Sequence, residues 1–147
     1  MNIHNTDNVS YKKFRPHGRI SFAVLENNLV VYKALGPFNL ELLNALKEIE
    51  PDVLQEMKIN NGIWGETVIF ENSCLAVDEF FLQFRAYIQA MVKRNILPIA
   101  SAYVISENIE GAALMARKYQ QCYQGTGIHF KIFKNEGDAI SWVKGFL

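Results

Sequence analysis

The sequence lacks several of the features that point quickly to a function. Its charges balance, because 15 Lys and Arg residues stand against 15 Asp and Glu residues. Nucleic-acid binders usually need a basic face, so this balance argues against that class. There is no apolar run near the ~20 residues of a membrane-spanning helix, and the polar first residues lack the apolar core of a signal peptide. We therefore expect a cytoplasmic protein with no membrane span and no nucleic-acid partner.

Motifs for metal binding and catalysis are also missing. The three histidines, His4, His17 and His129, have no metal-ligand spacing. The two cysteines, Cys74 and Cys122, are far apart and are expected to be reduced and buried. There is no nucleophile elbow and no phosphate loop between a strand and a helix. We predict no catalytic residues, no metal site and no cofactor.

The most informative stretch of the chain runs from Glu66 to Ile105. Residues 67–70 form a short apolar run, residues 78–94 carry apolar side chains at helical spacing, and residues 97–105 are again mainly apolar. This pattern predicts a strand, a helix and a second strand. Such a unit indicates a parallel sheet covered by helices.

The flanking segments extend this unit into one α/β domain. Residues 19–35 predict a β-hairpin, with Asn27 and Asn28 in a turn that needs positive φ. Helices are expected from Asn39, from a break at Pro51, from Ser106 and from Asn135, and a last strand over 128–133. The predicted fold is an N-terminal hairpin followed by alternating helices and strands, with a mixed sheet of about five strands and about four helices. Residues 1–18 are assigned to a flexible lead and residues 19–147 to the domain.

The predicted binding region is the end of the sheet where the parallel strands finish and the helices begin. Ligands and partners gather at this end of open α/β sheets. The candidate residues all follow predicted strand ends: Asn39, Glu71, Asn72, Ser73, Asp78, Glu79 and Ser106. A purely structural interpretation, in which they cap helices, stays open.

A second candidate is the apolar arc of the central predicted helix. Phe80, Phe84, Tyr87 and Met91 fall at helical spacing within it. Packing on the sheet explains such an arc, and so does a ligand pocket or a dimer contact. All three interpretations stay open.

Local sequences suggest a family as well as a fold class. Val68-Ile69-Phe70-Glu71 resembles a STAS strand that ends in an acidic residue, and residues 132–143 resemble the closing strand and helix of that fold. STAS domains include the cytoplasmic domains of sulfate transporters and the bacterial anti-sigma-factor antagonists. In regulatory members an Asp before the central helix is followed by a phosphorylated serine or threonine. Here Asp78 is followed by Glu79, so that hydroxyl is missing.

The resemblance implies a non-enzymatic regulatory or protein-interaction module, with a protein partner docking around Asp78 and Glu79. A homodimer is also compatible with this assignment. The alternative is a domain that binds or carries a small apolar, lipid-like ligand against the aromatic arc. A third hypothesis is an enzyme that uses Cys74 or a carboxylate.

Overall fold

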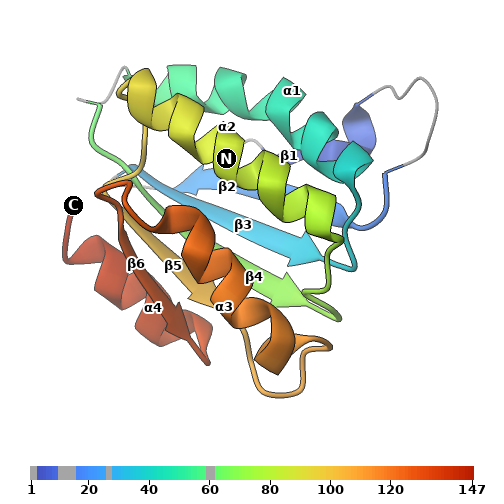
Figure 1. The fold of residues 1–147 in the computed structure, drawn as a ribbon. Helices are drawn as coiled ribbons and strands as arrows, with labels where there is room; N and C mark the ends of the chain where they lie inside the picture. The colour runs from blue at the N-terminus through green and yellow to red at the C-terminus, as the bar shows by residue number, and fades with distance from the viewer. Residues whose placement is uncertain (1–2, 10–15, 26–27, 59–61) are drawn as a thin grey trace.

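A computed structural model describes residues 3–9, 16–25, 28–58 and 62–147. It is an α/β protein with a mixed six-stranded sheet in the order β1-β2-β3-β4-β5-β6 (Figure 1). The strands are β1 Ile3–Asn5, β2 Arg19–Leu25, β3 Leu29–Leu35, β4 Gly65–Glu71, β5 Ala100–Val104 and β6 His129–Phe133. The helices are α1 Leu40–Lys58, α2 Asp78–Lys93, α3 Ala112–Tyr123 and α4 Glu136–Lys144, with a short 3-10 helix η1 at Thr6–Asn8.

The sheet is antiparallel at one side and parallel at the other. β2 pairs antiparallel with β1 and β3, whereas the pairs β3–β4, β4–β5 and β5–β6 are parallel. The predicted hairpin and the predicted alternation of strands and helices are therefore confirmed. Asn28 has a φ of 61°, as the predicted turn requires; Asn27 lies outside the described residues.

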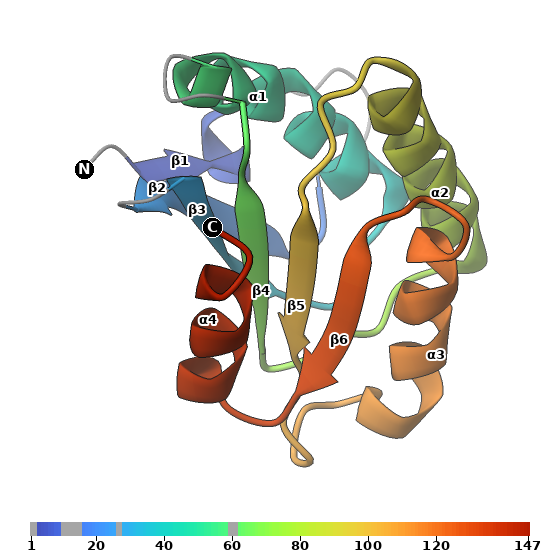
Figure 2. The ribbon, with the colours of Figure 1, turned by 90° about the vertical axis from the view of Figure 1, so that its left-hand side faces the viewer.

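Helices cover the two faces of the sheet unequally (Figure 2). α1, α2 and α3 lie over one face, and α4 lies alone on the other, against β4, β5 and β6. Side chains alternate between the faces along each strand. In β5, Tyr103 belongs to the large core under three helices, whereas Ala100 and Ala102 belong to the smaller core under α4.

The N-terminal segment adds a strand that the sequence analysis did not include. Residues 3–8 were assigned to the flexible lead, yet Ile3–Asn5 pairs with β2 and Thr6 is buried, its Oγ1 accepting from the Ile20 backbone N–H at 3.0 Å. Because β1 lies outside β2, β2 is not an edge strand of the sheet. A run of three residues is too short to show the periodicity that predicts a strand.

Three predicted helix boundaries are wrong. α1 continues through Pro51 without a break, because its apolar stripe, from Leu42 to Leu54, stays buried on both sides of the proline. Ser106 does not cap α3: the N-cap is Gly111, whose φ of 83° only glycine adopts readily. Glu110, just before Gly111, instead forms a parallel β-bridge with Ser73, and its carbonyl accepts from the Cys74 N–H at 2.9 Å.

The third error concerns the start of α2. Asp78 is the first helical residue rather than its cap, and Val77 occupies the N-cap position without a side-chain hydrogen bond. By contrast, Asn135 caps α4 as predicted, since its side chain accepts from the Asp138 N–H at 2.9 Å.

The contrast between a buried and an exposed leucine tests the layer of helices. Leu42 on α1 is fully buried and Leu82 on α2 is 70% exposed. We expect Leu42→Ala to lower the free energy of unfolding in urea by about 3 kcal/mol, through lost burial and a new cavity. Leu82→Ala should change it by less than about 0.5 kcal/mol. Equal losses would contradict the placement of α1.

Candidate functional site

The predicted binding region is assembled in part by loops after β3 and β4. The Asn72 side chain donates to the Gly36 carbonyl at 3.1 Å, and the Phe38 N–H donates to the Leu75 carbonyl at 2.8 Å. Asn39 caps α1, since its side-chain oxygen accepts from the Leu42 N–H at 3.0 Å. These contacts place Asn39, Glu71, Asn72 and Ser73 at the same end of the sheet.

The remaining candidates differ in exposure. Ser73 is fully buried, and its Oγ accepts from the Leu75 N–H at 3.1 Å, so it stabilises the loop. Asp78 and Glu79 are exposed, and Asp78 forms an ion pair with Lys118 of α3 at 3.1 Å. Ser106 lies in the separate loop after β5, where its carbonyl accepts from the Ile109 N–H.

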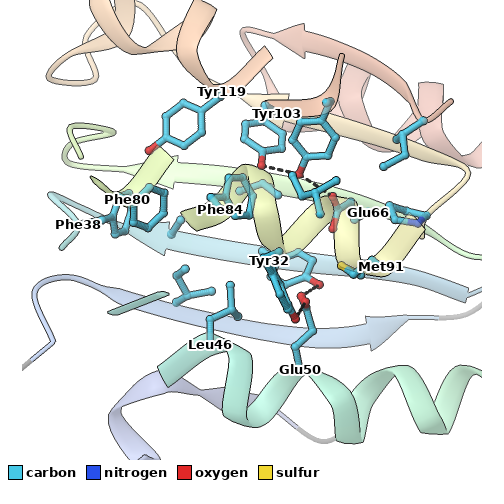
Figure 3. A pocket seen from close by; sticks show the side chains of 18 of the residues that line it. Tyr32, Phe38, Leu46, Glu50, Glu66, Phe80, Phe84, Met91, Tyr103 and Tyr119 are labelled. Atoms are coloured by element: carbon cyan, nitrogen blue, oxygen red, sulfur yellow. Dashed lines mark hydrogen bonds between the residues drawn. The ribbon is translucent and has the colours of Figure 1, made fainter. Parts of the chain in front are cut away.

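A pocket lies between the sheet and the three helices α1, α2 and α3 (Figure 3). It encloses a cavity of about 60 Å³, and one water molecule needs only about 10–15 Å³. The four residues of the predicted aromatic arc, Phe80, Phe84, Tyr87 and Met91, all line it. Val68 lines the floor and stays half-buried although it lies on β4 in the middle of the sheet. The side chains around this space therefore do not fill it.

Two carboxyl groups from different elements line this mainly apolar pocket (Figure 3). Glu50 comes from α1 and is 4% exposed, and Glu66 comes from β4 and is 7% exposed. Burying a carboxyl group without partners is costly, so each should have hydrogen-bond donors.

Hydroxyl groups supply those donors. The Tyr32 hydroxyl donates to Glu50 Oε2 at 2.5 Å, and the Tyr87 hydroxyl donates to Glu50 Oε1. Ser101 Oγ and the Tyr123 hydroxyl both donate to Glu66 Oε1, at 2.7 and 3.0 Å.

A second pair of tyrosines extends this network. The hydroxyls of Tyr103 and Tyr123 lie 2.6 Å apart, and their rings meet edge to face at 5.5 Å. Tyr119 donates instead to the Cys74 carbonyl at 2.8 Å, which fixes α3 to the loop after β4. The pocket is thus bounded by rings whose hydroxyl groups are already oriented.

Burial changes the acidity of both carboxyl groups. Loss of water raises the pKa of Glu66 to about 7, and the nearby charge of Glu50 acts in the same direction. Burial likewise raises the pKa of Glu50, against the opposing effect of its two tyrosine hydrogen bonds. Glu66 therefore changes its protonation near neutral pH.

The thiol groups do not offer comparable chemistry. Burial raises the pKa of Cys74 and of Cys122 to about 11, so both stay protonated near neutral pH. Across residues 3–9, 16–25, 28–58 and 62–147, no three His, Cys, Asp or Glu side chains gather in a way that suits a metal ion. Nor does any helix within those ranges have the length and apolar character to cross a membrane.

Glu50 and Glu66 were missed by the sequence analysis, although the sequence carries a signal for each. Glu50 lies four residues after Leu46 and four before Leu54, on the apolar stripe of α1. Glu66 shares a strand face with Val68 and Phe70. An acidic residue at a position with apolar periodicity indicates a buried carboxyl group, but not what it meets.

The stability of the protein should depend on pH through Glu66. Its pKa rises from 4.5 to about 7 on folding, so the native state binds more protons between these values. Its stabilising contribution is therefore complete below about pH 4.5 and is lost as the pH rises through about 7, a change of about 3 kcal/mol. The measurement is the free energy of unfolding in urea at several pH values from 5 to 8. We expect Glu66→Gln, which resembles the protonated acid, to remove the part of its pH dependence that comes from Glu66.

Glu71→Gln is the matched control, because Glu71 is exposed at the far end of the same strand. It should keep the wild-type slope of the free energy of unfolding against pH. A Glu66→Gln slope identical to that of the wild type would contradict the buried carboxyl.

In comparisons with family models, with curated proteins and with solved structures, no match to the chain was found. The STAS assignment therefore remains a prediction from element order and local sequence.

Proposed function

We propose that this protein binds a small, mainly apolar molecule in the pocket between the sheet and helices α1, α2 and α3. The observation that carries the proposal is the unfilled cavity of about 60 Å³ among aromatic and aliphatic side chains. Ligand sites are typically concave and apolar, with a few convergent polar groups. Glu50, Glu66 and their hydroxyl donors are such groups.

The two faces of the sheet are packed differently, and this difference supports a ligand pocket on the face under α1, α2 and α3. On the α4 side, Ala100, Ala102 and Ala139 are fully buried and let the helix lie close to the sheet. On the pocket side, large rings such as Tyr103 and Phe84 line the gap. Protein interiors are ordinarily close-packed, so a gap of this size lined by preorganised hydroxyls favours a ligand.

Benzene is a suitable first probe, because apolar cavities bind it without specific polar contacts. We expect benzene to shift the NMR methyl signals of Val68, Met91 and Leu97, which line the pocket. The methyl signals of Leu29 and Val143, in the core under α4, should stay in place. Native mass spectrometry of the purified protein would then show whether an apolar ligand accompanies it.

Filling the pocket should abolish this binding. Val68→Phe adds a ring inside the cavity, whereas Val31→Phe makes the same change on the opposite sheet face, beside the α4 core. We expect the first variant to lose the benzene shifts and the second to keep them. Val68→Met, a smaller addition, should weaken binding if Val68→Phe fails to fold. Benzene shifts that persist in a folded Val68 variant would contradict the proposal.

A second proposal is a regulatory or protein-interaction role at the end of the sheet where β3 and β4 finish. The observation that favours it is the side chain of Val77, 51% exposed beside the exposed carboxylates of Asp78 and Glu79. Apolar side chains ringed by charge are common in docking surfaces. A basic partner would fit this arrangement, in keeping with the STAS resemblance.

Charge reversal tests this second role. The double variant Asp78→Lys, Glu79→Lys should lose partners that the wild type captures, as measured by affinity capture and mass spectrometry. The control Glu48→Lys, Asp52→Lys reverses two exposed charges on α1 and should keep them. An unchanged set of captured proteins would contradict docking at this end.

A further inference from the structure

The two buried carboxyl groups have no cationic partner within the described parts of the chain. The ion pairs found there involve Asp7, Asp78 and Glu107, and none reaches Glu50 or Glu66. Lys47 instead lies over the Tyr87 ring, with Nζ 5.7 Å from its centroid. Buried carboxylates are usually paired with a cation. A positive charge is the group that this pocket lacks.

Within the part of the chain that the structure describes, one oxygen of Glu66 receives no hydrogen bond. Both of its hydrogen bonds end on Oε1, and among residues 3–9, 16–25, 28–58 and 62–147 none donates to Oε2. A carboxylate accepts hydrogen bonds at both oxygens, so the described residues leave Oε2 without a donor in a residue that is 7% exposed. Glu66 lines the cavity, and that open acceptor belongs to the pocket.

Aromatic rings surround the same space. Tyr32, Phe84, Tyr87, Tyr103 and Tyr123 all line it, and Tyr103 and Tyr123 meet at 5.5 Å between ring centroids. The faces of such rings attract cations, most strongly where water is excluded. The rings also accommodate an apolar chain. Both properties suit a molecule that has a positive head and a short hydrocarbon body.

We propose that the pocket binds a small amphipathic amine, whose ammonium group donates to Glu66 Oε2 while its hydrocarbon part lies among the aromatic rings. This inference rests on the proposed ligand-binding function and names the ligand class. An anionic ligand would meet two carboxyl groups, and a neutral one would leave their charge uncompensated. An ammonium group forms a charge-assisted hydrogen bond and offsets the cost of the buried carboxylate.

Protonation of Glu66 should control the affinity for the amine. The titratable groups around it come from several elements of the pocket: Glu50 of α1, Tyr32 of β3, Tyr87 of α2, Tyr103 of β5 and Tyr123 of α3. Arg94, just after α2, acts on Tyr87 and is not a lining residue of the pocket. Burial raises the pKa of these tyrosines above their usual value, so they stay neutral between pH 6 and 8. Glu66, with a pKa of about 7, loses its proton across this range.

Three probes with the same carbon chain separate the head groups: n-butylamine, 1-butanol and butyrate. At pH 8 we expect n-butylamine to bind about tenfold more tightly than 1-butanol, and butyrate more weakly than either. The affinity for n-butylamine should fall about tenfold from pH 8 to pH 6, because the ionised fraction of Glu66 falls by that factor. Dissociation constants come from NMR titration of the Val68 and Met91 methyl signals.

Two substitutions assign the preference to the carboxyl groups. Glu66→Gln should remove the advantage of n-butylamine and its pH dependence, while 1-butanol binds as before. Glu48→Gln, at an exposed position of α1, should change neither. If Glu66→Gln does not fold, Glu50→Gln should move the fall in n-butylamine affinity to a lower pH, because the charge of Glu50 raises the pKa of Glu66. An unchanged pH dependence in a folded Glu50→Gln would overturn the amine assignment.

Different results would overturn the amine assignment and the proposed ligand-binding function. Equal affinity for n-butylamine and 1-butanol at pH 8, or a preference that survives in Glu66→Gln, would overturn the amine assignment and leave the pocket as an apolar site. If no butyl compound shifted the pocket methyl signals and benzene also failed to do so, the proposed binding function itself would be overturned.

Discussion

The hydrogen bonds that hold Glu50 and Glu66 inside the protein connect nearly every element on one side of the sheet. Glu50 of α1 receives donors from β3 and α2, through Tyr32 and Tyr87. Glu66 of β4 receives donors from β5 and α3, through Ser101 and Tyr123. A buried carboxyl group that loses its donors is costly, so these contacts restrict how α1, α2 and α3 can lie on the sheet. The pocket is the space that this arrangement leaves.

The two sides of the sheet show different solutions to packing. Under α4, alanine and valine side chains leave room for the close approach of a single helix. Under α1, α2 and α3, tyrosine and phenylalanine rings supply many of the contacts, and the hydroxyls of Tyr32, Tyr87 and Tyr123 donate to the carboxyl groups. Aromatic rings prefer edge-to-face and offset contacts, and here several of them also have hydroxyl groups held by hydrogen bonds. The cavity on this side lies among these rings, and the hydroxyl and carboxyl groups at its wall favour some ligands over others.

The sequence was sufficient for the architecture because the relevant signals are local. Apolar periodicity predicted the strands and helices between Glu66 and Ile105, and Asn135 predicted its own helix cap. The errors arose where distant contacts decide the outcome. Pro51 stays helical because of the buried stripe around it, and the start of α3 is displaced to Ala112 because Glu110 pairs with the loop of Ser73.

The candidate site was predicted only in part for the same reason. Phe80, Phe84, Tyr87 and Met91 lie on one helix, so their shared face was visible in the spacing. Glu50 and Glu66 are 16 positions apart and meet the same pocket only through the packing of α1 on the sheet. Their periodicity marks each as buried, but hydroxyl donors from four other elements cannot be assigned without the fold.

The most direct test of this account is the pKa of Glu66, measured from its side-chain carboxyl carbon by NMR in the folded, ligand-free protein. We expect a midpoint of about 7, displaced from the ordinary 4.5 by burial and by the charge of Glu50. A midpoint near 4.5 would mean that water or a cation reaches the carboxylate. The pocket would then lack the desolvated acid on which its proposed ligand preference depends.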